Sequence, residues 1–280
     1  MVVEIESVAM EKVELIKQMA KRMRRCILEM SYSCNGPAHL GGGLSMVEIM
    51  ATLYGGVMNF QAQNPTWENR DRFILSKGHG VLGLYSALLE SGIITENVIK
   101  TFKENESHLI AHPVMNLELG IESSNGSLGQ GLSLAVGLAW AAKKKGEHHR
   151  VFALLGDGEC NEGMIWEAAM SASHFKLDNL IAIVDFNKFQ SDGESKDIMR
   201  SDGMSDRWRS FGWEVNEVDG HSVPELLLSL NEPPSEMGPK VVVAHIIKGK
   251  GISFMENNNQ WHHNRLTEKL YLEAITELEV

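Results

Sequence analysis

The chain has 280 residues, of which 43% are hydrophobic and 22% charged, and its formal net charge at pH 7 is −11. That acidic balance argues against nucleic acid as a partner, because such binding needs a basic surface that displaces counterions. No signal-type segment or run of about 20 apolar residues is visible, and Cys26, Cys34 and Cys160 form neither a disulfide framework nor a zinc pattern, so we expect a soluble cytoplasmic protein without a membrane partner.

The first third of the chain predicts two helices separated by a flexible segment. Residues 6–32 carry apolar side chains at helical spacing, which predicts one long amphipathic helix. Three consecutive glycines, Gly41-Gly42-Gly43, predict a flexible turn because glycine is unfavourable inside a helix. A second helix is expected over residues 44–54.

Two glycine clusters follow, and each opens a predicted helix. The apolar residues 73–76 predict a strand that leads into Lys77-Gly78-His79-Gly80 and a helix over 81–89, which places His79 at the carboxyl end of a strand. Glycines 126, 129 and 131 precede an apolar helix ending near residue 146, which we expect to be buried on all sides. The spacing GxxGxG differs from the GxGxxG of dinucleotide sites, so a Rossmann nicotinamide site is not expected.

The central stretch, residues 151–193, predicts two strands joined by one helix. Strands over 151–155 and 180–184 end at Gly156-Asp157-Gly158 and just before Asn187. In a parallel sheet these ends lie at one edge, where ligands of open α/β sheets bind. With further strands over 213–215 and 241–247, and a helix starting at Ser222, the chain predicts a single α/β domain over residues 1–280, with a mainly parallel sheet and helices on both faces.

The residues of this edge are suited to holding a cation and a phosphate group. Glycines 156 and 158 let an anion approach the main chain, and the helix that follows favours negative charge at its N-terminus. Asp157 beside a phosphate is explicable if a cation lies between them, and Asn187 adds a neutral oxygen, as Mg²⁺ requires. The residues alone leave open that Asp157 and Asn187 only stabilise turns.

The motifs of the chain resemble those of transketolases, a family of thiamine-diphosphate enzymes. Gly156-Asp157-Gly158 followed by Asn187 is similar to the thiamine-diphosphate signature, and the flanking segments resemble transketolases from about residue 15 to about residue 265. The similar segments are DRFILSKGHG, AHPVMNLELGIESSNGSLGQGLSLAVG, GDGECNEGMIWEAAMSASH, IVDFNKFQSDG and KGKGISF followed by WHH.

The resemblance implies a role for each matching residue. Mg²⁺, or Ca²⁺ or Mn²⁺ in its place, would be held by Asp157, Asn187 and the main-chain carbonyl of Phe189. The cofactor-binding residues would be His79, Gly126, Ser127, Leu128, Gly158, Glu162, Asn187, Lys248 and His262, with Glu162 near a subunit interface. The catalytic histidines would be His39, His79, His112 and His262; we prefer His262 to His263 because an ungapped match from KGKG to WH ends there.

The resemblance also implies an incomplete enzyme. Transketolases move a two-carbon ketol unit from a ketose (phosphate) to an aldose (phosphate) through a dihydroxyethyl adduct of thiamine diphosphate, and central pentose-phosphate metabolism is the default setting. The chain covers only their diphosphate-binding domain, so we expect the pyrimidine-binding and C-terminal domains on a separately encoded subunit, in an α₂β₂ heterotetramer. Ala38 and Ala111 stand where the family usually has glycine, which leaves the sugar specificity open.

Three other functions are compatible with parts of the pattern. The α subunit of a 2-oxo acid decarboxylase or dehydrogenase would share the metal motif but not the histidines. A non-catalytic thiamine-diphosphate-binding partner would look the same if it were inactive. A metal-dependent phosphosugar hydrolase could use Asp157 as a ligand.

Overall fold

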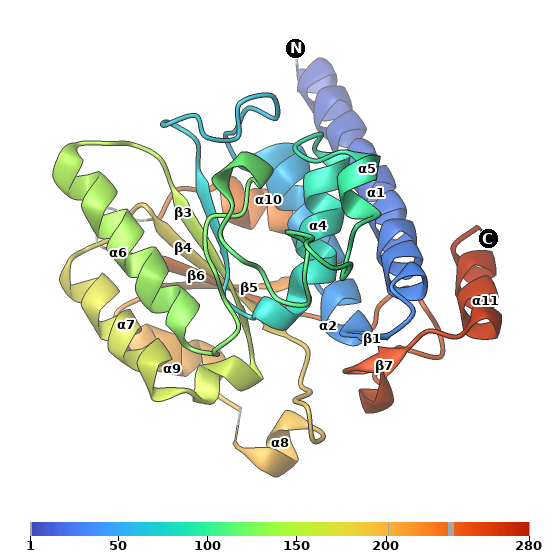
Figure 1. The fold of residues 1–280 in the computed structure, drawn as a ribbon. Helices are drawn as coiled ribbons and strands as arrows, with labels where there is room; N and C mark the ends of the chain where they lie inside the picture. Colours follow the sequence, from blue (N-terminus) through green and yellow to red (C-terminus); the bar gives the residue numbers. More distant parts are fainter. Residues whose placement is uncertain (1, 201, 235–237, 280) are drawn as a thin grey trace.

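The structure, a computed structural model, describes residues 2–200, 202–234 and 238–279. Its centre is a five-stranded parallel sheet in the order β2-β3-β4-β6-β5 (Figure 1). The strands are β2 (Arg72–Leu75), β3 (Val151–Gly156), β4 (Leu180–Phe186), β5 (Glu214–Asp219) and β6 (Lys240–His245). The predicted α/β fold with a mainly parallel sheet is therefore confirmed.

Side chains alternate between two hydrophobic cores on opposite faces of the sheet. Phe152 and Leu154 of β3 belong to one core, whereas Val151, Ala153 and Leu155 belong to the other. Strands buried on both faces are continuous apolar runs, which is why they are recognisable in the sequence. Figure 1 shows helices on both sides of the sheet, as predicted.

Helices cover both faces of the sheet. One face is covered mainly by α1 (Val2–Ser33), α3 (Val47–Thr52), α4 (Val81–Glu90) and α10 (Val223–Asn231), and the other by α6 (Gln130–Lys145), α7 (Gly163–His174) and α9 (Met204–Ser210). The remaining α-helices are α2 (Leu40–Leu44), α5 (Glu96–Ile99), α8 (Ser195–Ile198) and α11 (Glu268–Glu279). Within the described residues, no helix is long and apolar enough to cross a membrane.

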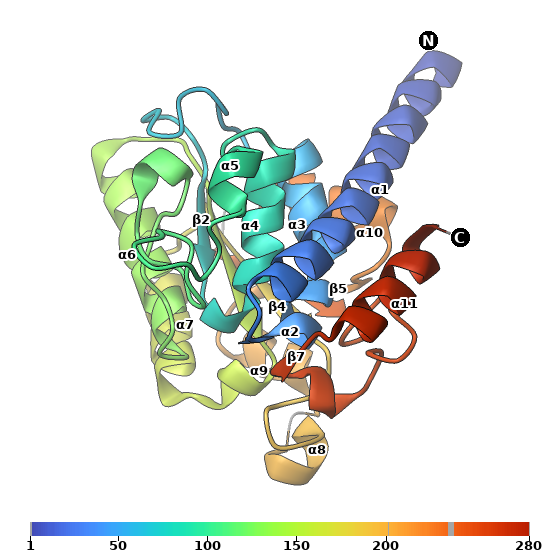
Figure 2. The same cartoon turned by 45° about the vertical axis from the view of Figure 1, so that its right-hand side comes forward.

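The first and last helices of the chain pack against each other beside the sheet. Helix α11 lies along α1 (Figure 2), and the rings of Tyr32 and Tyr271 stack with centroids 4.5 Å apart. A two-stranded antiparallel sheet pairs β1 (Pro37–Ala38) with β7 (Asn264–Arg265). This pairing joins the loop that carries His39 to the loop that carries His262 and His263.

The prediction of a flexible turn at Gly41-Gly42-Gly43 is wrong. These glycines lie inside the buried helix α2, and the predicted helix over 44–54 is divided into α3 and a π-helix at Leu53–Val57. A Cβ atom would lie 3.0 Å from the His79 ring at Gly42 and 2.9 Å from Leu82 Cβ at Gly43. The glycines are needed for close packing rather than for flexibility.

The prediction that the helix ending near residue 146 is buried on all sides is also wrong. In α6 one face packs on the sheet and α7, but Leu134 and Trp140 on the other face are 41% and 42% exposed. The helix is in the outer layer of the fold, so only one side of it reaches the core.

Candidate active site

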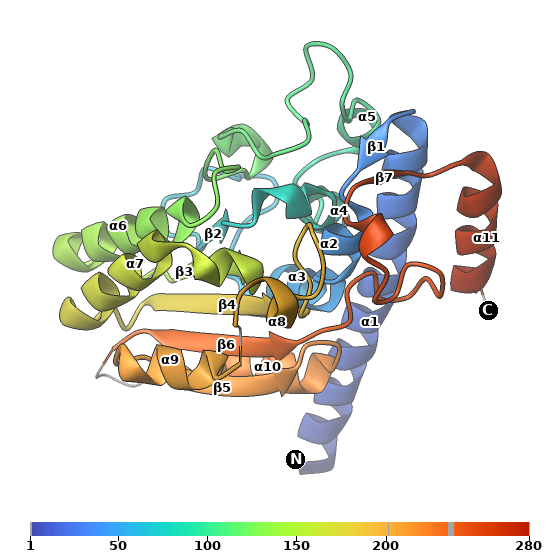
Figure 3. The same ribbon diagram turned by 90° about the horizontal axis from the view of Figure 1, so that it is seen from below.

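Parallel strands bring the predicted metal ligands to one edge of the sheet. Gly156 of β3 is paired with Asp185 of β4, so Asp157 and Asn187 lie just beyond neighbouring strand ends. Figure 3 shows β4 and β6 pointing the same way, toward this edge. The edge contains a cavity of about 250 Å³. Its lining includes eight of the residues expected at the site: His79, Leu128, Asp157, Gly158, Glu162, Asn187, Phe189 and His262.

Asp157 is a buried carboxylate that forms no ion pair with a basic side chain in the described part of the chain. Its Oδ2 accepts hydrogen bonds from the Lys188 main-chain N at 2.9 Å and from Ser195 Oγ at 3.0 Å. Burial, followed by the nearby charge of Asp185, raises the pKa of Asp157 to about 6. A bound cation would reverse this effect, because it favours the ionised carboxylate.

The amide of Asn187 is oriented by its neighbours. Asn187 Nδ2 donates to Asp185 Oδ1 at 2.9 Å, and Asn187 Oδ1 accepts from the Phe189 main-chain N at 3.0 Å. Lys188 between them has a left-handed φ of +65°, which is uncommon for a non-glycine residue and turns the chain sharply at this point. The turn brings the Phe189 segment against the cavity.

The donor set fits a hard divalent cation. Among the described residues no cluster of three or more His, Cys, Asp or Glu side chains could hold a metal ion. A cation beside Asp157 would therefore depend on amide, main-chain and ligand oxygens, which are the donors that Mg²⁺ and Ca²⁺ prefer. The arrangement is suited to a metal that arrives with a phosphorylated ligand.

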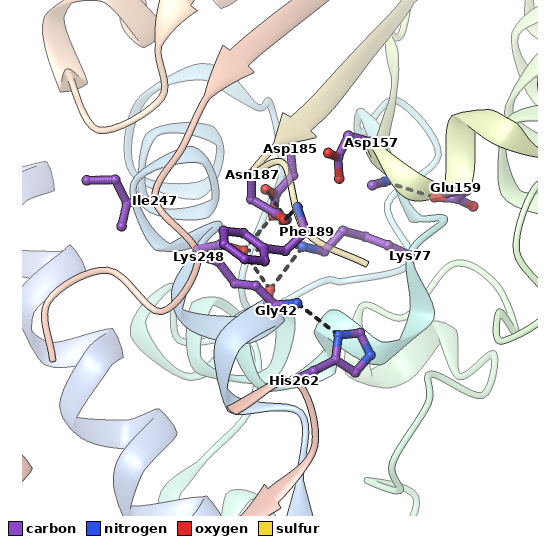
Figure 4. A network of polar contacts seen from close by, with 12 residues as sticks. Gly42, Lys77, Asp157, Glu159, Asp185, Asn187, Phe189, Ile247, Lys248 and His262 are labelled. Atoms are coloured by element: carbon purple, nitrogen blue, oxygen red, sulfur yellow. Dashed lines mark hydrogen bonds and ion pairs between the residues drawn. The ribbon is translucent and has the colours of Figure 1, made fainter. Parts of the chain in front are cut away.

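A buried ion pair, which the sequence motifs do not predict, lies beneath the predicted metal ligands. Lys77 Nζ contacts Asp185 Oδ2 and donates to the Gly42 carbonyl at 3.0 Å (Figure 4). Ser45 Oγ also donates to Asp185 Oδ2, at 2.6 Å. Lys77 and Asp185 are fully buried. Because Asp185 also accepts from Asn187, the pair fixes the amide that faces the cavity. A single carboxylate near the end of an apolar strand is the signal that the sequence offers.

Glu159 joins three segments of the site and is likewise absent from the predicted site residues. Its carboxylate accepts from Ser76 Oγ at 2.5 Å, from the Gly129 main-chain N at 2.9 Å and from the Gly156 main-chain N at 3.0 Å. Its burial raises its pKa. Glu159 thereby holds the predicted cofactor-contacting turn at 126–128 against the ends of β2 and β3.

The turn at 126–128 is packed closely against the loop after β2. A Cβ atom at Gly78 would lie 2.6 Å from the Asn125 carbonyl oxygen, so only glycine allows this approach. A Cβ atom at Gly126 would lie 3.6 Å from the His112 ring, which places this glycine beside one of the predicted catalytic histidines. Leu128 reaches the cavity, whereas Gly126 and Ser127 are not among its lining residues.

Five histidines from four loops lie together at this edge. The centroid of the His39 ring is 5.6 Å from those of His79 and His262, 5.7 Å from that of His112 and 4.4 Å from that of His263. Burial and neighbouring positive charge lower the pKa of His39 to about 3 and that of His262 to about 4, and they also lower those of His79 and His112. These four rings are therefore neutral at pH 7 and can both donate and accept hydrogen bonds.

Lys248 connects the histidines to the strand ends. Its Nζ lies 3.0 Å from His262 Nδ1 (Figure 4). It also donates to Asn259 Oδ1 at 3.0 Å. Burial, followed by the charge of Lys77, lowers the pKa of Lys248 to about 8. Of the two adjacent histidines, His262 meets Lys248 and lines the cavity, while His263 packs on His39.

Residues 16–275 match the family described as the thiamine diphosphate binding domain of transketolase. The chain is 41% identical over 245 residues to a 6-deoxy-6-sulfo-D-fructose transketolase subunit of Clostridium sp. (strain MSTE9), covering 87% of this chain and 89% of that protein. It is 42% identical over 248 residues to an apulose-4-phosphate transketolase subunit of Actinobacillus succinogenes, covering 89% and 90%.

Full-length transketolases are similar over only part of their length. The human enzyme is 35% identical over 269 residues, which are 96% of this chain but 42% of that protein. The crystal structure of transketolase from Campylobacter jejuni superposes with a TM-score of 0.88 at 30% identity, covering 95% of this chain and 43% of that one. The chain thus spans about two fifths of these enzymes, but nine tenths of the relatives whose names describe them as subunits.

Proposed function

The chain belongs to the transketolase family, and we propose that it is the thiamine-diphosphate-binding subunit of a transketolase that transfers a two-carbon ketol unit from a ketose to an aldose. The observation that carries this proposal is the cavity in which Asp157 and Asn187, at adjacent strand ends, face neutral histidines. The comparisons favour this function over a 2-oxo acid dehydrogenase subunit or a phosphosugar hydrolase.

In this proposal the strand ends hold Mg²⁺ and the diphosphate. Asp157, Asn187 and the main-chain carbonyl of Phe189 would bind the metal, and the Gly158 main chain and His79 would meet the diphosphate. When bound, thiamine diphosphate supplies the carbon nucleophile and the electron sink for cleaving and forming carbon–carbon bonds. Lys248 would add positive charge on the side of His262, opposite the buried carboxylates.

The histidines would handle the sugar. A neutral imidazole can accept a proton from a hydroxyl at one nitrogen and donate one at the other, so His39, His112 and His262 would orient sugar hydroxyls and move protons at the reacting oxygen atoms. His263 packs on His39 and would shape the same wall. The donor and acceptor would be sugars that carry an anionic end group such as phosphate, in either pentose-phosphate metabolism or a specialised pathway.

The site also requires a second chain in this proposal. Residues 1–280 would form the diphosphate-binding domain, while a separately encoded subunit would carry the pyrimidine-binding and C-terminal domains in a cytoplasmic α₂β₂ assembly. Exposed apolar side chains next to the cavity and along α6 and α7 support such a contact: Leu128, Leu134, Trp140, Met164, Met170 and Phe175. Glu162, the N-cap of α7, lies among them, as a residue near an interface should.

Calorimetry with thiamine diphosphate and Mg²⁺, with and without the candidate partner, tests the proposal. We expect the chain alone to bind weakly and without ketol transfer, and we expect the partner to tighten binding and restore transfer. Absence of binding in both settings would exclude the function. Full ketol-transfer rates from the chain alone would exclude the second subunit, and binding without transfer in the complex would point to a non-catalytic partner.

A further inference from the structure

A buried polar network outside the cofactor cavity joins three elements that are far apart in the sequence. Glu48 of α3 accepts a hydrogen bond from Arg24 Nη2 of α1 at 2.5 Å through Oε1, and its Oε2 lies 3.0 Å from Nδ1 of His221, in the loop after β5. Arg24 and Glu48 are buried. None of the three residues lines the cofactor cavity, and the function proposed above gives them no role.

Both ends of this network form hydrogen bonds with the main chain of segment 247–250. His221 Nε2 accepts a hydrogen bond from the Ile247 main-chain N at 2.9 Å, and Arg24 Nε donates to the Lys250 carbonyl at 3.0 Å. Because Nε2 is the acceptor, the ring proton is on Nδ1 and is donated to Glu48. Glu48 therefore couples the two groups that hold the segment at its start and at its end.

This segment, 247–250, contains Lys248, whose side chain extends into the site. Lys248 is 2% exposed, and Figure 4 shows its side chain reaching His262 while Ile247 lies apart from Asp157 and Asn187. Gly249 has a φ of +78°, and a Cβ atom there would lie 2.4 Å from the Met255 carbonyl oxygen, so the turn after Lys248 has little freedom. The position of the Lys248 amine thus depends on where the network holds the main chain on either side.

We propose that Arg24, Glu48 and His221 act as positioning residues that set Lys248 in the cofactor site. The inference rests on the proposed function, in which the ligand that Lys248 approaches is thiamine diphosphate. In metal sites, loss of a group that orients a contacting residue typically lowers affinity by 10- to 100-fold, and we expect an effect of the same order for the amine that approaches the diphosphate. A network that served only the stability of the fold would not change the accessibility of one amine selectively.

The test compares H221A with the matched control H245A in the full chain. His221 and His245 both lie at the ends of neighbouring strands and contact a carboxylate, but the His245 ring is exposed and pairs with Glu217 at 3.1 Å. Three quantities are measured: amide hydrogen exchange at Ile247 and Gly249, the rate of Lys248 acetylation by acetic anhydride, and the Kd for thiamine diphosphate with Mg²⁺.

For H221A we expect exchange at Ile247 and acetylation of Lys248 to accelerate about tenfold, with β3 and β4 amides unchanged, and the Kd to rise about tenfold. H245A should stay within about twofold of the wild type in all three, as surface substitutions do. If H221A loosens the whole sheet, E48Q gives the same test with the side-chain volume preserved.

Unchanged acetylation, or faster acetylation with an unchanged Kd, would overturn the positioning role. If the wild type fails to bind thiamine diphosphate with or without its partner, the proposed function fails instead. Exchange and acetylation in the unliganded chain still decide whether the network positions Lys248.

Discussion

Two regions of the site are built in different ways. At the strand ends, the buried charges of Lys77, Asp157 and Asp185 are held by strand register and by main-chain hydrogen bonds. At the histidine cluster, the neutral rings of His39, His79, His112 and His262 come together from separate loops. In the proposed function, the first region would fix a charged ligand, whereas the second would contact the uncharged hydroxyl groups of the sugar.

The largest effect should come from breaking the buried ion pair. K77M leaves the Asp185 carboxylate buried without its cation, and removing one partner of such a pair typically costs about 3–5 kcal/mol. The free energy of unfolding in urea measures this. The control is K143M, because Lys143 pairs with Asp178 at the surface, where the loss should be below about 1 kcal/mol. Equal losses in the two variants would contradict the view that stability is concentrated at the strand ends.

Asp157 should matter for the ligand but not for the stability of the unliganded chain. D157N should raise the Kd for Mg²⁺ and thiamine diphosphate more than about 100-fold, which corresponds to about 2.7 kcal/mol. The pKa of Asp157 is raised to about 6 in the folded chain, so its ionisation destabilises the unliganded chain as the pH rises from about 4 through 6. In D157N, the free energy of unfolding should therefore fall less than in the wild type over this pH range.

Calorimetry gives the affinity of D157N, and urea unfolding between pH 4 and 7 gives its stability. D178N, which removes an exposed carboxylate, should leave the affinity unchanged. A D157N chain that binds normally would exclude Asp157 as a metal ligand, and a large loss of unliganded stability at pH 7 would assign it a structural role.

The histidine cluster should respond to pH in the opposite direction. The pKa of His39 is lowered to about 3 in the folded chain, below the ordinary value of about 6.5, so the unfolded chain binds more protons between these values. The stability contributed by neutral His39 is present above pH 6.5 and is lost as the pH falls toward 3. At pH 5 unfolding should take up about one proton fewer in H39Q than in the wild type.

The proton count follows from the slope of the unfolding free energy against pH. H148Q, at an exposed histidine outside the site, should keep the wild-type slope. An unchanged slope in H39Q would mean that His39 is protonated in the folded chain, and the cluster would then be cationic rather than neutral.

The same two regions separate what the sequence could predict from what it could not. The sequence predicts all five strands, although only β2 and β3 are apolar runs that lead into glycine turns, and β5 is mostly polar. The placement of Asp157, Asn187 and His79 at the sheet edge follows because the parallel register brings strand ends together. The partners of Asp185 do not follow, because Ser45 and Lys77 lie 140 and 108 residues away in the chain. No local pattern reports a contact at that distance.

The wrong predictions have the same origin. A run of three glycines indicates flexibility when only the local sequence is considered. The group that packs against Gly42 is the His79 ring, which comes from a distant segment and is not visible in that pattern. The apolar composition of α6 predicts burial on all sides. Composition alone does not show that one side of the helix, with Leu134 and Trp140, faces away from the core. The contact of His263 with His39 depends on the pairing of β1 with β7, two-residue strands too short to predict. The individual roles of the site residues remain predictions.

The smallest effect should come from Ala38, which is buried in β1 directly before His39 and stands where the family resemblance leads us to expect glycine. A38G removes one methyl group beside the histidine cluster and adds main-chain freedom, at a cost of about 0.5–1 kcal/mol in stability. Because the change leaves the strand ends untouched, the Kd for thiamine diphosphate should stay within about twofold, while kcat/KM for the ketose in the complete complex should change by less than about tenfold, through KM. A141G on α6 makes the same chemical change away from the site and should leave KM as it is. A shift in cofactor affinity with no shift in KM would show that the wall beside His39 belongs to the diphosphate side, and the division between the two regions would then have to be drawn elsewhere.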